Sequence, residues 1–128
     1  LIKDKNYSFL SLQKDNFSTD IKLNNLQKFI TDFSEQIDIG DKSFVDTISI
    51  LNNIDLLISV DTSMTHLAST MGVKTLLLLN SNPDWRWNIE LKEKCFYENL
   101  EIIKADRIND WEFVSLMINN KLRKLFDR

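Results

Sequence analysis

Residues 55–79 read "DLLISVDTSMTHLASTMGVKTLLLL", two apolar runs on either side of a polar segment. The runs at 55–60 and 74–79 are largely apolar, as is typical of parallel strands buried on both faces. Between them, apolar residues recur at helical spacing, namely Met64, Leu67, Ala68 and Met71. Gly72 follows at the position where glycine commonly ends a helix. The order strand, helix, strand predicts part of a parallel α/β sheet.

The rest of the chain continues this alternation. Further strands are predicted at 7–13, 36–40 and 100–105, and further helices at 22–33, 43–54 and 109–126. Ser43 is the expected cap of its helix, with Asp46 at the third position, and Asn109 with Glu112 predicts a capping box. The apolar stripe of the last helix consists of Trp111, Val114, Ile118, Leu122 and Leu125. We therefore predict one α/β domain over 1–128, a Rossmann-like parallel sheet with helices on both faces.

Composition excludes several classes of protein. A net charge of −3 argues against general affinity for nucleic acid or an anionic membrane. No apolar run approaches the roughly 18 residues that a membrane span needs. One cysteine and one histidine exclude an internal disulfide and metal sites rich in either residue. A single cysteine fits a reducing compartment, so we expect a cytoplasmic location. Cys95 is expected to be a buried thiol, and the chain, which begins without methionine, to be a piece of a longer protein.

Open parallel sheets bind ligands beyond the carboxyl ends of their strands. Three predicted strands end in polar groups there: Gln13 and Lys14, then 61–63, then 80–86. We expect these groups to converge on one edge of the sheet. Lys14 either reaches a phosphate or is solvated, and a lone lysine is more often solvated.

The turn at 61–66 allows two interpretations. The predicted apolar stripe leaves three polar residues on the side opposite the core: Thr62, His66 and Ser69. In one interpretation Asp61 or Thr62 caps the helix and His66 is a surface residue. In the other, the free amides of 62–65, the hydroxyls of Thr62 and Ser63 and the His66 imidazole hold a diphosphate at the positive end of the helix dipole. Asp61 would repel a diphosphate, so we expect it to orient the turn or accept a sugar hydroxyl.

The segment "PDWRW" at 83–87 is also unusual for a loop. Exposed tryptophans are costly, and Arg86 between them can donate a bidentate pair to a phosphate or carboxylate. Alternatively, Trp85 and Trp87 fill a gap against a neighbouring element while Arg86 pairs with a local acid. The sequence favours neither interpretation.

The segments at 11–13, 43–79 and 83–87 together resemble the C-terminal domain of bacterial glycosyltransferase family 9. That family contains the ADP-heptose:lipopolysaccharide heptosyltransferases, and such domains often follow tetratricopeptide repeats. The resemblance runs from about residue 9 to the last helix. It departs at Ser69 and Thr70, where many relatives have glycine and alanine. It departs again at "CFYENL", where "WYP" is expected and Tyr97 is the one match.

The resemblance implies the C-terminal half of a GT-B glycosyltransferase, in which two Rossmann-like domains enclose the active site. This half binds the nucleotide-sugar donor without a metal, and the other domain supplies the general base. By position, the residues that contact the donor diphosphate are Asp61, Thr62, Ser63, Met64 and His66. The partners implied are the donor and an N-terminal Rossmann-like domain or repeats of the parent protein.

The leading hypothesis is therefore transfer of a sugar, in the manner of heptosyltransferases, from a nucleotide diphosphate sugar to a glycan or other hydroxyl. Transfer of N-acetylglucosamine to protein, as in the repeat-linked O-GlcNAc transferases, is an alternative. A third hypothesis is a degenerate, non-catalytic binding or assembly module with Trp85 and Trp87 as contact residues.

Overall fold

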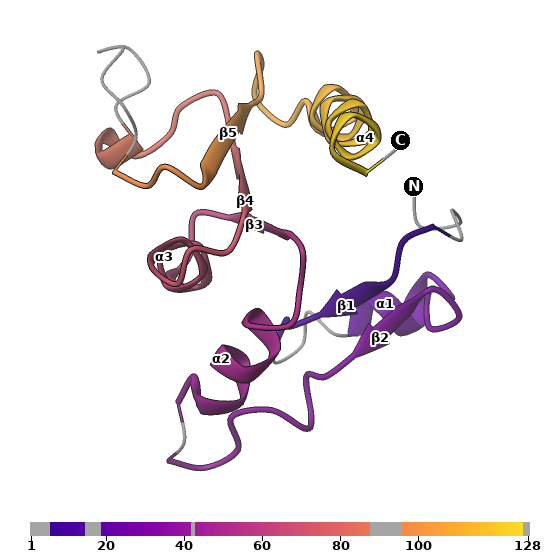
Figure 1. Ribbon diagram of the computed structural model, residues 1–128. Coiled ribbons are helices and arrows are strands. Elements are labelled where there is room, and N and C mark those ends of the chain that lie inside the picture. The colour runs from indigo at the N-terminus through magenta and orange to yellow at the C-terminus, as the bar shows by residue number, and fades with distance from the viewer. Residues whose placement is uncertain (1–5, 15–18, 42, 88–95, 127–128) are drawn as a thin grey trace. The chain divides into compact units, whose positions relative to one another are not determined.

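The computed structural model describes residues 6–14, 19–41, 43–87 and 96–126. The chain forms two compact units, Leu1–Ile50 and Leu51–Arg128, and each contains its own parallel sheet (Figure 1). The predicted α/β class with parallel strands is confirmed.

The second unit is built on a three-stranded parallel sheet in the order β3-β4-β5. Its elements are β3 (Leu57–Val60), α3 (Ser63–Thr70), β4 (Thr75–Leu79), β5 (Leu100–Lys104) and α4 (Trp111–Phe126). All five coincide with predicted strands and helices. Gly72 follows α3 with a φ of 81°, a left-handed conformation that glycine adopts without strain.

Alternate residues of β4 pack on opposite faces of this sheet. Leu76 packs with Ile103 and Val114 on the face that α4 covers. Leu77 and Leu79 pack on the other face, together with Trp87 and Leu100. Figure 1 shows α3 and α4 on opposite sides of the sheet. A strand that is buried on both faces needs apolar residues throughout, which explains the unbroken leucine run.

In the last helix, α4, most of the predicted apolar stripe is confirmed, but the predicted start is not. Trp111 is 48% exposed and so does not belong to the buried stripe. The carboxylate of Asp110, not the side chain of Asn109, accepts the Phe113 N–H at 3.2 Å. Asn109 has a φ of 61°, so the chain is still turning there and the helix begins one residue later than the predicted cap implies.

The first unit contains β1 (Phe9–Ser11) and β2 (Ile30–Asp32), which pair in parallel, with α1 (Thr19–Leu23) and α2 (Val45–Leu51). The predicted helix over 22–33 is wrong, because α1 ends at Leu23 and β2 occupies the end of that segment. Asn24 donates from its side chain to the Asp20 carbonyl at 2.8 Å, and Asn25 has a φ of 54°. These asparagines end the helix by local side-chain bonding and a left-handed backbone.

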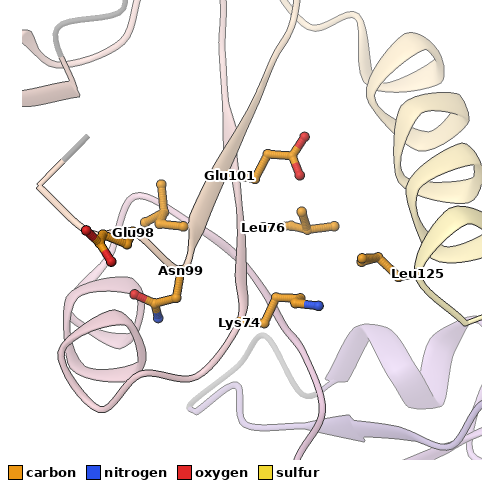
Figure 2. A pocket seen from close by; sticks show the side chains of 7 residues that line it. Lys74, Leu76, Glu98, Asn99, Glu101 and Leu125 are labelled. Atoms are coloured by element: carbon orange, nitrogen blue, oxygen red, sulfur yellow. The ribbon is translucent and has the colours of Figure 1, made fainter. Parts of the chain in front are cut away.

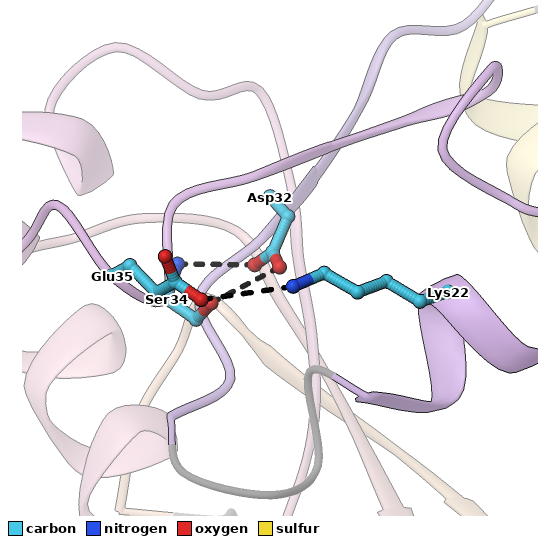
Figure 3. A network of polar contacts seen from close by, with 4 residues as sticks. All are labelled: Lys22, Asp32, Ser34 and Glu35. Atoms are coloured by element: carbon cyan, nitrogen blue, oxygen red, sulfur yellow. Dashed lines mark hydrogen bonds and ion pairs between the residues drawn. The ribbon is translucent and has the colours of Figure 1, made fainter.

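The predicted strand over 36–40 is also wrong, because turns and bends occupy this segment. Asp38 and Gly40 have φ values of 47° and 70°, which an extended strand cannot accommodate. Just before this segment, the Asp32 carboxylate accepts the Ser34 N–H and the Ser34 hydroxyl, each at 3.0 Å (Figure 3). An ion pair of 3.7 Å between Lys22 and Glu35 connects α1 with the turn that follows β2.

Asp38 caps α2 from outside the helix. Its Oδ1 accepts the Asp46 N–H at 2.8 Å and the Thr47 N–H at 3.3 Å, and its Oδ2 accepts the Thr47 hydroxyl. The Asp46 carboxylate in turn accepts the Asp38 N–H at 2.8 Å. The predicted cap, Ser43, is therefore replaced by a residue farther back along the chain that the left-handed turn brings over the helix N-terminus.

Because of Asp38, the free energy of unfolding should depend on pH in the acid range. Partial burial raises its pKa, but hydrogen bonds from Thr47 and Asp46 and the charge of Lys14 leave the pKa below its ordinary value. A carboxyl with a lowered folded pKa contributes stability above its ordinary pKa of about 3.9 and loses it as the pH falls through the lowered value. Asn tolerates the left-handed backbone, so Asp38→Asn should keep the turn. The substitution then removes only the negative charge and one hydrogen-bond acceptor. We expect the variant to lose about 1 kcal/mol near neutral pH and most of this acid dependence.

Urea unfolding followed by circular dichroism at about pH 7 and about pH 3 measures both effects. Asp41→Asn, which changes an exposed carboxylate nearby, is the matched control and should leave both values unchanged. An Asp38→Asn variant that loses as much stability in acid as the unmodified chain would contradict this role.

Candidate functional site

Polar residues follow two neighbouring strands at the carboxyl edge of the three-stranded sheet. β3 is followed by Asp61, Thr62 and Ser63, all exposed, and β4 by the segment 80–86. Val60 pairs with Leu78, so these two strands end almost level. The predicted convergence of polar groups at one sheet edge therefore holds for these two segments.

Gln13 and Lys14 follow β1 and belong to the first unit. Both are exposed. The Gln13 N–H donates to the Ser11 hydroxyl at 3.4 Å, and the Lys14 ammonium donates to the Asp38 carbonyl at 2.9 Å. The ammonium of Lys14 thus has a local partner at the turn that caps α2.

The N-terminus of α3 lacks a side-chain cap. Thr62 occupies the N-cap position with an extended backbone, φ −143° and ψ 168°, but its side chain makes no cap hydrogen bond. Its hydroxyl lies 3.3 Å from that of Ser59 instead. Thr65 ties the first turn to the strand, since its hydroxyl donates to the Val60 carbonyl at 2.8 Å. The Thr65 N–H donates to the Thr62 carbonyl at 3.1 Å, so the predicted set of free amides over 62–65 is wrong for Thr65. The N–H groups of Ser63 and Met64 open the helix and have no acceptor within it, so an anion at this exposed end would satisfy them.

The buried face of α3 differs from the predicted one. Thr65, Ala68 and Ser69 are the buried residues of this helix. Ser69 was expected on the side away from the core, and that prediction is wrong. Small side chains on this face allow a close approach to the sheet, while the larger Met64 and Leu67 are only half-buried. Within the described residues, the buried Ser69 hydroxyl has no hydrogen-bond partner.

His66 is held by two side chains from the connection between β4 and β5. Its ring stacks on Trp87 with centroids 5.1 Å apart and planes 16° from parallel. Its Nδ1 lies 3.0 Å from the Tyr97 hydroxyl. His66 is half-buried, so it is neither a free surface residue nor a core histidine. Tyr97 was not predicted as a site residue, and its separation of 31 positions from His66 leaves no periodic signal in the sequence.

The segment "PDWRW" separates its two tryptophans. These residues form a short 3₁₀ helix, η2 (Trp85–Trp87). Trp87 is only 4% exposed and packs in the core beside Leu77, whereas Trp85 is 82% exposed. Arg86 forms an exposed ion pair with Asp84, with Nε 3.1 Å from Oδ1. Trp87 thus fills a gap in the core and Arg86 pairs with a local acid, which agrees with the second interpretation of this segment. Trp85 does not share the buried role.

A separate hollow of about 160 Å³ lies at the amino ends of β4 and β5, where α4 approaches them (Figure 2). It is lined by Lys74, Leu76, Glu98, Asn99, Leu100, Glu101 and Leu125. An ion pair between Lys121 and Glu101 adjoins it. None of the predicted site residues lines this hollow.

Two further properties concern the described part of the chain. No three His, Cys, Asp or Glu side chains gather there to form a metal site. No helix among these residues has the length and apolarity to cross a membrane. Cys95, predicted to be a buried thiol, lies outside the described residues.

Comparisons of the chain with protein-family models, with curated proteins and with solved structures found no match. The function is therefore argued from the residues at the carboxyl edge of the sheet.

The two tryptophans of η2 should differ sharply in their contribution to stability. Trp87→Ala removes a buried aromatic side chain and should lower the free energy of unfolding by about 3–5 kcal/mol. Trp85→Ala, two residues away and exposed, should change it by no more than about 0.5 kcal/mol. Urea unfolding of both variants, followed by far-UV circular dichroism, makes the comparison. Equal losses in the two variants would contradict the placement of Trp87 in the core.

Proposed function

We propose that the second unit, Leu51–Arg128, is the donor-binding half of a GT-B glycosyltransferase. It binds a nucleotide diphosphate sugar, and the parent protein transfers that sugar to a glycan or other hydroxyl, as a heptosyltransferase does. The single observation that carries the proposal is the exposed N-terminus of α3, which has no side-chain cap and lies at the carboxyl edge of a parallel sheet. Ligand sites of open α/β sheets occur at this edge.

The chemistry of this turn suits a diphosphate. Peptide amides at a helix N-terminus donate to phosphate oxygens, and the helix dipole favours negative charge there. The exposed hydroxyls of Thr62 and Ser63 add donors, and His66 lies in the same turn. As the bond from sugar to phosphate breaks, negative charge grows on the diphosphate, so these donors stabilise the transition state. Asp61 is exposed beside them and can accept a hydroxyl of the sugar.

Arg86 can join this site only by leaving Asp84. Their ion pair is partly exposed, and exposed ion pairs contribute at most about 1 kcal/mol. A diphosphate carries more charge than one carboxylate and offers bidentate acceptors to the guanidinium. The cost of exchanging partners is therefore small compared with the new interaction.

The general base belongs to another part of the parent protein in this proposal. The 128-residue chain should therefore bind the donor without transferring sugar.

The alternative of a non-catalytic binding module is favoured by two exposed aromatic side chains. Trp85 is 82% exposed and Phe96 is 87% exposed, and large exposed aromatic side chains are typical of contact surfaces.

Replacement of one backbone amide tests the diphosphate site directly. Ser63 is the first helical residue, where proline is well tolerated, and the extended Thr62 suits a following proline. Ser63→Pro removes the N–H together with the side-chain hydroxyl. Calorimetry with a panel of ADP-, UDP- and GDP-sugars should detect one donor that binds the chain. Ser63→Pro should then weaken that binding by about tenfold or more, because it removes a hydrogen bond to a charged group.

Ser63→Ala is the matched control, because it keeps the amide and removes only the hydroxyl. It should weaken binding less than Ser63→Pro does, and circular dichroism should show unchanged helix content in both variants. If no nucleotide sugar binds the chain, or if Ser63→Pro and Ser63→Ala lose the same affinity, the diphosphate site is refuted.

A further inference from the structure

The orientation of the His66 ring is fixed from two directions. Trp87 stacks against the ring face, and Trp87 is itself packed against Leu77 and Leu79 of β4. The Tyr97 hydroxyl lies 3.0 Å from Nδ1, and the two rings are tilted by 59°. Both residues come from the connection between β4 and β5. The stack sets the plane of the imidazole, and the tyrosine hydroxyl sets which edge of the ring faces the protein.

The contact with Tyr97 differs between the two neutral forms of the imidazole, because Nδ1 accepts in one form and donates in the other. A phenol O–H is a good donor, while an unprotonated imidazole nitrogen is a good acceptor. Either atom can be the donor in this 3.0 Å contact. When the Tyr97 hydroxyl donates to Nδ1, the ring proton resides on Nε2. Nε2 has no partner among the described residues, so its N–H is available to a ligand. The hydrogen bond at one ring nitrogen thus determines the protonation of the other.

The position of His66 directs this donor toward the start of the helix. His66 is the fourth residue of α3, and side chains of an α-helix lean toward its N-terminus. This lean directs the ring toward the first turn of α3, where the N–H groups of Ser63 and Met64 have no acceptor within the helix. An Nε2–H there adds to the row of backbone donors, whereas an unprotonated Nε2 would be an acceptor and repel a phosphate oxygen.

We propose that Tyr97 is a positioning residue, which holds His66 in the Nε2–H form so that Nε2 donates to a phosphate oxygen bound at the N-terminus of α3. This inference rests on the proposed diphosphate site and adds a residue that the sequence did not assign to it. Tyr97 itself need not touch the ligand.

Nitrogen-15 NMR of the imidazole tests the positioning without any ligand. His66 is the chain's one histidine, so the ring signals need no assignment. At about pH 8, where an imidazole is ordinarily neutral, Nε2 should show the shift of a protonated nitrogen and Nδ1 that of an unprotonated, hydrogen-bonded one. Tyr97→Phe should move the Nδ1 signal and raise the share of the Nδ1–H form. Tyr7→Phe changes the chain's other tyrosine, which packs on Phe9, and should leave both signals unchanged.

Binding of inorganic pyrophosphate tests the consequence. Tyr97→Phe should weaken it by about threefold to tenfold, the value of one hydrogen bond, whereas Tyr7→Phe should have no effect. In a His66→Gln background, the glutamine side-chain amide can donate a hydrogen bond whether or not Tyr97 is present. Adding Tyr97→Phe to this background should therefore cause no further loss of affinity for pyrophosphate. Such non-additivity shows that Tyr97 acts through His66 and distinguishes positioning from a direct contact of Tyr97 with the ligand.

The two proposals fail in different ways. If the unmodified chain does not bind pyrophosphate, the diphosphate site fails, and the nitrogen-15 spectrum alone decides the role of Tyr97. If the ring proton resides on Nδ1, or if Tyr97→Phe weakens binding equally in both backgrounds, the positioning role is overturned even though pyrophosphate binds.

Discussion

The second unit depends on the burial of β4 between two parallel neighbours. β4 pairs with β3 on one side and β5 on the other, and its leucines alternate between the two covered faces. Each fully buried leucine contributes about 1.5–3 kcal/mol of transfer free energy. The pairing brings the ends of β3 and β4 to one edge, where α3 begins. Trp87, which follows β4, and Tyr97, which precedes β5, both contact His66 of α3.

In the proposed diphosphate site, net charge does not favour the anion, so the affinity has to come from hydrogen-bond geometry. The chain carries a net charge of −3, and Asp61 and Asp84 belong to the two segments at the carboxyl edge. Amide donors in a fixed turn compensate for this because their directions are set by the helix before a ligand arrives. The extended backbone at Thr62 and the bond from Thr65 to the Val60 carbonyl fix that turn. Affinity should therefore depend on backbone geometry more than on surface charge.

The sequence predicted the elements whose signal is local and strong, and the site only in part. The apolar runs that became β3 and β4 were readable because burial on both faces excludes polar residues. The predicted helix over 22–33 failed because left-handed residues such as Asn25 end elements without changing apolar spacing. Ser69 was misplaced because a small polar side chain can be buried where a helix approaches a sheet closely. The contact between His66 and Tyr97 arises from the tertiary fold, which no local period encodes.

Amide chemical shifts locate the proposed binding of a diphosphate at the N-terminus of α3. Proton–nitrogen correlation spectra of the isotope-labelled chain, recorded during titration with inorganic pyrophosphate, report every backbone N–H at once. A diphosphate at the N-terminus of α3 should cause saturable shifts that are largest at residues 62–66, with smaller ones at 84–87. Shifts centred instead on Lys74, Asn99 and Glu101, at the opposite end of the sheet, or no saturable shifts at all, would contradict this site.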